Sequence, residues 1–403
     1  MDRYKSFFRG IAYAGYCIVF LFAVYTFEKS IPDQIYVKAG EAIDYQFQVP
    51  VTMEIQEDSS PVAKSTNNAN VRQSYIVTCR LFGIFPVKDI EVVLVDGDAV
   101  YAGGMPIGIY VKTSGVLVIG TSEVERPDGS EAAPAENILK AGDYILSVNG
   151  EKVAEKEDLQ HLVQQNGAEK EILKINRKGE EVEVGVTPVQ NKNGTYMLGA
   201  WVRDDLAGIG TLTYYKEDGT YGALGHAVSD GDVGERIQMS EGYVYNAQII
   251  GVKKGQKGNP GELSGMIRYQ GADCLGTIEE NTDIGIYGKL DGNIAALPRG
   301  DYYNICYKQD IKQGSATIIC GFTGEKKEYA IEIESLDYSG REANKGILFR
   351  VTDEQLLDMT GGIVQGMSGS PILQDGKIIG AVTHVFVSDS SMGYGIFIEN
   401  MVE

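Results

Sequence analysis

The sequence is poor in histidine, tryptophan and cysteine for its length. Its 403 residues include 3 histidines, 1 tryptophan and 5 cysteines. The cysteines contain no C-x-x-C pair, and no spacing of cysteine and histidine matches a zinc site. We therefore expect neither a metal ion nor another cofactor. The sequence leaves any disulfide pairing undetermined.

Basic residues are also in the minority. The chain has 36 Lys and Arg against 56 Asp and Glu, a formal net charge of −20. Such a surface repels phosphates, so nucleic acid is not an expected partner. The 50 glycines and 24 tyrosines, with many Val and Ile, favour short strands joined by tight turns. The length allows two or three domains, mainly β.

Charge is missing altogether from one stretch near the N-terminus, Gly10 to Phe27. The stretch is long enough to span a bilayer, and no small-x-small cleavage site follows it. Arg3, Lys5 and Arg9 precede it, which places the rest of the chain outside the cytoplasm. Residues 1–30 are therefore predicted to be a cytoplasmic tip and a single transmembrane anchor. A cleaved signal peptide is the alternative.

Residues 31–100 are predicted to form an extracytoplasmic N-terminal region. Residues 74–81 and 87–95 read as strands. Residues 54–72 are polar and unable to bury a core, which predicts a flexible surface segment. Such a segment would be open to proteolysis, including self-cleavage.

Residues 101–190 resemble a PDZ domain. Residues 140–153, Lys-Ala-Gly-Asp-Tyr-Ile-Leu-Ser-Val-Asn-Gly-Glu-Lys-Val, match the strand and hairpin pattern of that family. A short helix is expected over 158–165, and two closing strands over 171–186. PDZ domains bind an extended peptide at a sheet edge and hold its carboxylate in a backbone loop. The resemblance assigns that loop to Gly104, Met105, Pro106, Ile107 and Gly108.

The motif Gly-Gly-Ile-Val-Gln-Gly-Met-Ser-Gly-Ser-Pro-Ile-Leu, residues 361–373, predicts a nucleophile at Ser368. Small neighbours let a substrate carbonyl approach the serine oxygen. They also leave the N–H groups of Gly366 and Ser368 to form an oxyanion hole. Apolar strands follow, so residues 195–403 are expected to be a β-barrel serine peptidase domain. The alternative is a plain glycine turn.

A serine nucleophile needs a base, and histidine is the usual one. His226 lies in Gly-Ala-Leu-Gly-His-Ala-Val-Ser-Asp, which resembles the histidine loop of chymotrypsin-like enzymes. His384 ends an apolar strand and is the second candidate. His161 lies in the predicted PDZ helix and is the weakest. We predict that His226 is the base.

Three aspartates are candidates to orient the histidine. Asp230 and Asp232 are close to His226, but they lie in a glycine-rich turn where aspartate is common. Asp353 follows an apolar strand just ahead of the serine motif, and a strand end holds a side chain rigidly. The residues alone leave this choice open.

The order of these features resembles the stage IV sporulation protein B peptidases of endospore-forming bacteria. It runs from membrane anchor through PDZ domain to Gly-His-Ala-Val-Ser-Asp and Gly-Met-Ser-Gly-Ser-Pro-Ile, and Leu81 to Lys88 adds to the likeness. The resemblance covers essentially the whole chain. It implies a catalytic triad of Ser368, His226 and Asp353.

The same resemblance implies a place and a substrate. Such peptidases act in the space between the two membranes around the forespore. They cleave themselves and then a membrane-bound regulator of an intramembrane protease, which leads to activation of the late mother-cell sigma factor. These partners are implied by the resemblance alone.

The expected fold is mainly β, with a chymotrypsin-like double barrel. In chymotrypsin-like enzymes the aspartate lies between the barrels, whereas Asp353 is close ahead of Ser368, so a rearranged topology is the alternative. Two rival functions differ from the sporulation peptidase. A quality-control protease of the high-temperature-requirement type carries its PDZ domain after the protease domain, which is the opposite order. A non-catalytic PDZ scaffold would not need the serine, histidine and aspartate.

Overall fold

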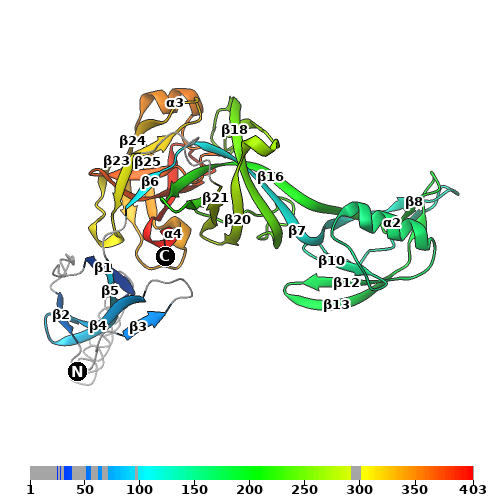
Figure 1. Cartoon of the computed structure of the whole chain (residues 1–403), viewed down its shortest axis with the longest axis horizontal. Helices are drawn as coiled ribbons and strands as arrows, with labels where there is room; N and C mark the ends of the chain where they lie inside the picture. The colour runs from blue at the N-terminus through cyan, green and yellow to red at the C-terminus, as the bar shows by residue number, and fades with distance from the viewer. Residues whose placement is uncertain are drawn as a thin grey trace, which may run out of the picture.

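The computed structural model describes Tyr25, Glu28 and residues 31–38, 51–55, 62–65, 71–95, 99–291 and 301–402. These residues form mainly β structure. A small N-terminal sheet lies beside a body of strands, and a PDZ domain lies at the far end of a long ribbon (Figure 1). None of the described helices is both long and apolar enough to cross a membrane. The predicted span from Gly10 to Phe27 lies outside the described residues, apart from Tyr25.

The N-terminal sheet has the strand order β1-β5-β4-β2, and β3 pairs with β4. Its core includes Ile35, Val77, Ile90 and Val92. The strands are β1 (Gln34–Lys38), β2 (Val51–Ile55), β3 (Val62–Ser65), β4 (Val71–Leu81) and β5 (Phe85–Val95). The described residues of segment 54–72 lie in β2, β3 and β4. Residues 56–61 and 66–70 lie outside the described residues, so the flexibility of the segment stays a prediction.

The first barrel is a closed ring in which each strand pairs with the next, in the order β7-β16-β17-β21-β20-β18 and back to β7. Ile107, Val111, Leu212 and Tyr221 are among the side chains packed inside it. Its strands are β7 (Pro106–Thr121), β16 (Ala200–Tyr215), β17 (Thr220–Ala223), β18 (Met239–Lys253), β20 (Cys274–Thr282) and β21 (Gly285–Leu290). β19 (Glu262–Ile267) extends from β18.

The second barrel closes in the order β23-β24-β25-β28-β27-β26 and back to β23. Tyr329, Phe349, Ile372 and Ile379 lie in its core. Its strands are β23 (Gly314–Cys320), β24 (Lys327–Leu336), β25 (Ile347–Val351), β26 (Pro371–Gln374), β27 (Lys377–Val385) and β28 (Met392–Phe397), with helices α3 (Glu354–Thr360) and α4 (Glu399–Val402). β6 (Ala99–Ala102) and β22 (Tyr302–Ile305) link the barrels, since β6 pairs with β16 and β22 pairs with β27. Two barrels side by side agree with the predicted double-barrel fold.

The PDZ domain is inserted between strands β7 and β16 of the first barrel (Figure 1). These strands pair along most of their length, from Thr121 with Ala200 to Pro106 with Thr211, and form the ribbon that carries the domain. Helix α2 and the closing hairpin confirm the sequence prediction, and the turn has positive φ at Lys178 and Gly179, as a tight hairpin requires. The domain contains β8 (Val124–Glu125), β9 (Glu131–Ala132), β10 (Tyr144–Val148), β11 (Glu151–Lys152), α2 (Lys156–Asn166), β12 (Glu171–Arg177), β13 (Glu180–Val186), β14 (Val189–Gln190) and β15 (Tyr196–Met197).

The first barrel begins earlier in the chain than expected. The segment assigned to the carboxylate-binding loop, Gly104, Met105, Pro106, Ile107 and Gly108, lies in this barrel and not in the PDZ domain. The Gly104 N–H donates to the Leu212 carbonyl (2.7 Å), and Ile107 is 1% exposed in the barrel core. The boundary was misplaced because β7 is one continuous strand shared by both bodies. Gly115, with φ of 95°, separates the part of β7 that pairs with β18 in the barrel from the part that pairs with β10 in the PDZ domain.

Candidate active site

The loop that carries Ser368 joins α3 to β26 and rests against the first barrel. The N–H of Thr211 in β16 donates to the Ser368 carbonyl (3.0 Å). Gly369 has φ of 97°, and a Cβ there would lie 2.0 Å from the Thr211 carbonyl oxygen. Only glycine allows both that backbone conformation and that approach. The glycine after Ser368 therefore lets the second barrel present the serine to the first.

His226 is presented from the first barrel, just after β17. The chain turns through Leu224 and Gly225, whose φ angles are 72° and 73°. A bulky residue at positive φ is rare and is held only by its surroundings. Leu224 is buried in the barrel core, so packing fixes the turn that aims His226.

Ser368 and His226 line the same cavity, of about 520 Å³, between the two barrels. His384 of β27 lines it as well. The rings of His226 and His384 are 5.4 Å apart between centroids, with a tilt of 44°. The tertiary structure thus brings the predicted nucleophile, the predicted base and the second histidine candidate together. A second cavity, of about 1170 Å³, lies between the barrel and the PDZ domain, and none of these three residues lines it.

The hydrogen bond of His226 selects one tautomer. Its Nδ1 lies 2.8 Å from the Ala227 carbonyl oxygen. A carbonyl only accepts, so Nδ1 carries the proton and Nε2 keeps its lone pair. That is the tautomer which a general base needs to take a proton from serine. The Ser368 hydroxyl itself donates to the Thr383 carbonyl, 2.8 Å away.

Burial lowers the pKa of both histidines. For His226, the hydrogen bond to Ala227 partly opposes this effect. For His384, the pKa falls to about 4, and the neighbouring His226 and Lys345 add to the effect of burial. Both rings are therefore neutral at pH 7. The hydrogen bond to Ala227, which leaves Nε2 of His226 without a proton, favours His226 as the proton acceptor.

The backbone around Ser368 leaves two donors for an oxyanion. The Met367 N–H donates to Val364 and the Gly369 N–H donates to Val382. Within the described part of the chain, the N–H groups of Gly366 and Ser368 have no such acceptor. The Thr211 hydroxyl donates to the Gly366 carbonyl (2.8 Å) and so restrains the peptide that joins Gly366 to Met367. The two free N–H groups are those predicted for the oxyanion hole.

The structure does not bring Asp353 into this cavity. Asp353 caps α3, where its carboxylate accepts from the N–H of Leu356 (2.9 Å) and, more weakly, from that of Ala330 (3.4 Å). Among the described residues, Asp353 does not line the cavity that contains Ser368 and His226. In this arrangement the Ala227 carbonyl, and not a carboxylate, faces Nδ1 of His226. The triad role of Asp353 stays a prediction.

The other two candidate aspartates pair with an arginine. Asp230 is buried and Asp232 is exposed, and both carboxylates accept from the Arg203 guanidinium. Neither has a hydrogen bond to His226 among the described contacts. Arg203 could not be predicted from a local motif, because it lies 23 residues before His226, in strand β16.

The remaining candidates have structural positions. Ser370 is 1% exposed, and its hydroxyl lies 3.3 Å from the Cys320 sulfur, which donates to it. His161 is exposed on α2. The described cysteines, Cys79, Cys274, Cys306 and Cys320, are free thiols. Sequence reasoning missed Thr211, Ala227 and Thr383. Ala227 and Thr383 act through their carbonyl groups, and Thr211 acts through its N–H and its hydroxyl. No local motif signals such contacts.

Two family profiles match the chain. Residues 194–402 match the family described as SpoIVB peptidase S55. Residues 127–177 match the PDZ domain. No curated protein matches the sequence. The first profile covers the serine loop, the histidine loop and most of both barrels, and the second lies within the inserted domain.

Proposed function

Because this chain belongs to the SpoIVB peptidase S55 family, we propose that it is a membrane-anchored serine endopeptidase that acts outside the cytoplasm during sporulation. Membership supports serine peptidase activity in sporulation. One observation supports the assignment of residues. Ser368 and His226 come from different barrels and line one cavity, beside the N–H groups of Gly366 and Ser368, which have no backbone acceptor among the residues that the structure describes.

The proposed chemistry follows from these positions. Nε2 of His226 takes the hydroxyl proton while Ser368 Oγ bonds to the substrate carbonyl carbon. The N–H groups of Gly366 and Ser368 stabilise the oxyanion. The C–N bond then breaks, and His226 returns the proton to the leaving amine. Water, deprotonated by His226, cleaves the acyl ester and restores Ser368.

The cavity wall favours an extended peptide as substrate. Leu206 to Ile209 of β16 form one wall. Over these residues the described strands pair with β16 only on its β7 edge. The backbone on the other edge is therefore available to hydrogen-bond a peptide added as a strand.

The substrates and the location rest on family resemblance. We propose that the peptidase cleaves itself, with the polar segment 54–72 as an accessible region. We further propose that it cleaves a membrane-bound regulator of an intramembrane protease, in the space between the forespore and mother-cell membranes. The N-terminal residues 1–30 would hold it at the membrane.

Self-cleavage and peptide hydrolysis by the full-length protein in detergent test the function. Wild-type protein should shorten with time and hydrolyse an unstructured fluorogenic peptide, and Ser368→Ala should do neither. A fluorophosphonate probe should label wild-type protein at Ser368. A folded wild-type protein without hydrolysis or labelling would favour the non-catalytic scaffold. Hydrolysis of unfolded proteins in general, with no preference for itself, would favour a quality-control protease.

A further inference from the structure

The segment from His226 to Gln238, here called the histidine loop, connects the cavity with the PDZ domain. At its start, His226 to Ser229 line the cavity. At its end, the Gln238 N–H donates to the Tyr144 hydroxyl (3.0 Å), and the Asn176 side-chain amide donates to the Gln238 side chain (3.1 Å). Tyr144 and Asn176 belong to PDZ strands β10 and β12. The histidine loop therefore begins at the cavity between the barrels and ends in contact with the PDZ domain.

Asp230 holds the shape of this loop from inside. Its side chain is fully buried, and one carboxylate oxygen accepts from the N–H groups of Asp232 (2.8 Å) and Val233 (3.0 Å). The Asp230 backbone also bonds to Glu235 and Gly234. A carboxylate is stable in such a position only if its charge is compensated.

Arg203 supplies that compensation from strand β16. One guanidinium nitrogen donates to the second carboxylate oxygen of Asp230, and the other donates to Asp232 (3.0 Å). The Arg203 side chain is 33% exposed, whereas that of Asp230 is 0% exposed. Removing Arg203 would leave Asp230 buried and unpaired. The carboxylate would then be expected to move toward water, which would distort the loop four residues from His226.

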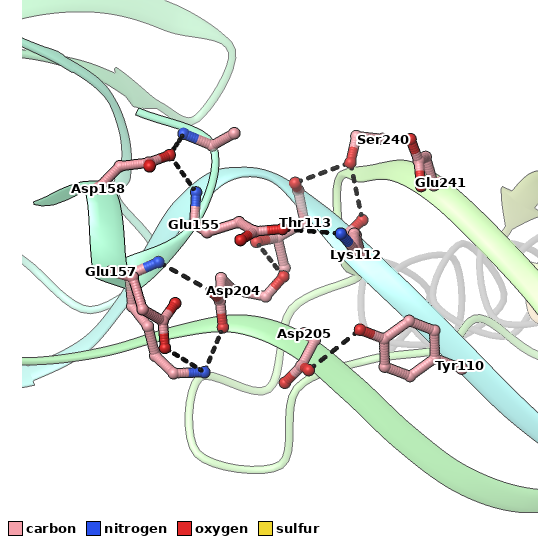
Figure 2. A network of polar contacts seen from close by, with 12 residues as sticks. Tyr110, Lys112, Thr113, Glu155, Glu157, Asp158, Asp204, Asp205, Ser240 and Glu241 are labelled. Atoms are coloured by element: carbon pink, nitrogen blue, oxygen red, sulfur yellow. Dashed lines mark hydrogen bonds and ion pairs between the residues drawn. The ribbon is translucent and has the colours of Figure 1, made fainter. Parts of the chain in front are cut away.

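Asp204, the next residue in β16, is bound to the PDZ domain. Its carboxylate accepts from the Lys156 N–H and from the Lys156 ammonium, both at 2.9 Å. Its carbonyl accepts from the Thr113 hydroxyl of β7 (3.1 Å). Figure 2 shows the Asp204 side chain extending from β16 toward the start of helix α2, near Glu157. Burial alone would raise the pKa of Asp204, but the contacts with Lys156 hold it below its usual value.

The pairing of β16 with β7 is irregular at this point. Arg203 faces Leu117 and Asp205 faces Lys112, so the register shifts at Asp204. Such an irregularity redirects neighbouring side chains. Successive side chains of a strand point to opposite faces, and here Arg203 contacts the histidine loop while Asp204 contacts helix α2.

We infer that Arg203 is a positioning residue for His226, acting through Asp230, and that Asp204 ties Arg203 to the PDZ domain. This inference rests on the proposed peptidase function for its consequence in catalysis. Its structural part, that Arg203 and Asp204 together fix the histidine loop, does not depend on that function. Because Arg203 and Asp204 are adjacent in β16, a displacement of helix α2 would be transmitted through these two residues to the histidine loop.

The test compares Arg203→Met with Arg236→Met in the full-length protein. Arg236 is a matched control, because it lies in the histidine loop itself and its side chain, among the described residues, makes just one exposed ion pair, with Asp283. Arg203→Met should lower kcat by about 10²-fold with KM unchanged, as expected for a misplaced catalytic group. Arg203→Lys should recover part of this loss. Arg236→Met should behave as wild type. Equal losses in both arginine variants, or a normal kcat in Arg203→Met, would overturn the positioning role.

Hydrogen exchange provides a readout that needs no activity. Amides of residues 226–238 should exchange faster in Arg203→Met than in the wild type. The increase should be smaller in the double variant Arg203→Met/Asp230→Asn, because the unpaired charge is removed. In Asp204→Asn, the exchange rate should increase both in α2 and in residues 226–238. Faster exchange confined to α2 would refute the link to the PDZ domain. If the wild-type protein hydrolyses nothing, the proposed function fails, while unchanged exchange in residues 226–238 of Arg203→Met would refute the inference itself.

Discussion

The hydroxyl of Ser368 donates to the carbonyl oxygen of Thr383, 2.8 Å away, at the end of strand β27. No hydrogen bond joins this hydroxyl to His226 among the described residues. Transfer of the proton to His226 therefore requires the Ser368 side chain to rotate away from Thr383. Catalytic hydrogen bonds often form only when substrate is bound, so the resting contact is compatible with a nucleophile.

Two serines of the same loop should respond differently to substitution. Ser370 is buried against Cys320, so Ser370→Ala removes a packing and hydrogen-bond contact but no reacting atom. We expect it to keep measurable hydrolysis, while Ser368→Ala loses hydrolysis and fluorophosphonate labelling. Peptide mapping of the labelled protein identifies the modified serine. A label on Ser370 would contradict the assignment.

The two histidines of the cavity can be distinguished in the same way. A base works best when its pKa is near the working pH, and the pKa of His384 is about 4. We expect His226→Ala to lose about 10²- to 10⁴-fold in kcat, the usual contribution of acid–base catalysis, and His384→Ala to lose much less. Steady-state kinetics on one peptide checks this. A greater loss in His384→Ala would make His384 the base.

The pH dependence of kcat/KM should report the lowered pKa of His226. The ring acts as a base only when neutral, and burial lowers its pKa from the ordinary value of 6.5. The neutral form therefore survives to lower pH than in an exposed histidine. Activity should be constant around pH 7 and fall only below pH 6.5 as the solution becomes more acidic. A profile on a substrate without titrating groups measures this, and an inflection above 6.5 would contradict it.

Asp353 offers a test between two roles. As the cap of α3 it can be replaced by asparagine, which caps equally well, whereas alanine should cost about 1 kcal/mol of stability. The geometry therefore predicts that Asp353→Asn keeps most activity. A triad role predicts a loss of about 10⁴-fold in kcat.

Comparing Asp353→Asn and Asp353→Ala by kinetics and thermal unfolding separates these outcomes. A folded, inactive Asp353→Asn would restore the triad assignment. It would also require the serine and histidine loops to rearrange from the arrangement described here.

Gly104 is expected to matter for stability. Its φ is 89°, and a Cβ there would lie 2.5 Å from the Ile319 side chain in the barrel interface. We expect Gly104→Ala to destabilise the protein by about 2 kcal/mol or more, from backbone strain and overpacking. Gly120, later in β7, is the control, since a Cβ there meets nothing within 4 Å. Urea unfolding measures both variants. A stable Gly104→Ala with altered peptide binding would return this segment to a role in recognition.

The sequence determined the features that depend on near neighbours. The serine motif, the small residues around His226 and the PDZ hairpin with helix α2 all follow from local backbone and side-chain requirements. The expected double barrel rested on the serine loop and the strands that follow it, and its closure depends on strands far apart in the chain. The local predictions agree with the structure because each requirement is met within a few residues.

The tertiary structure decided which distant residues meet. Strand β7 is shared between two bodies, so Gly104 to Gly108 joined the barrel and the PDZ domain became an insertion. Asp353 caps a helix, and Asp230 pairs with Arg203, although each had the residue type of a triad member. A carboxylate's role depends on the partner that compensates its charge. That partner is set by strand register and barrel closure between segments far apart in the chain.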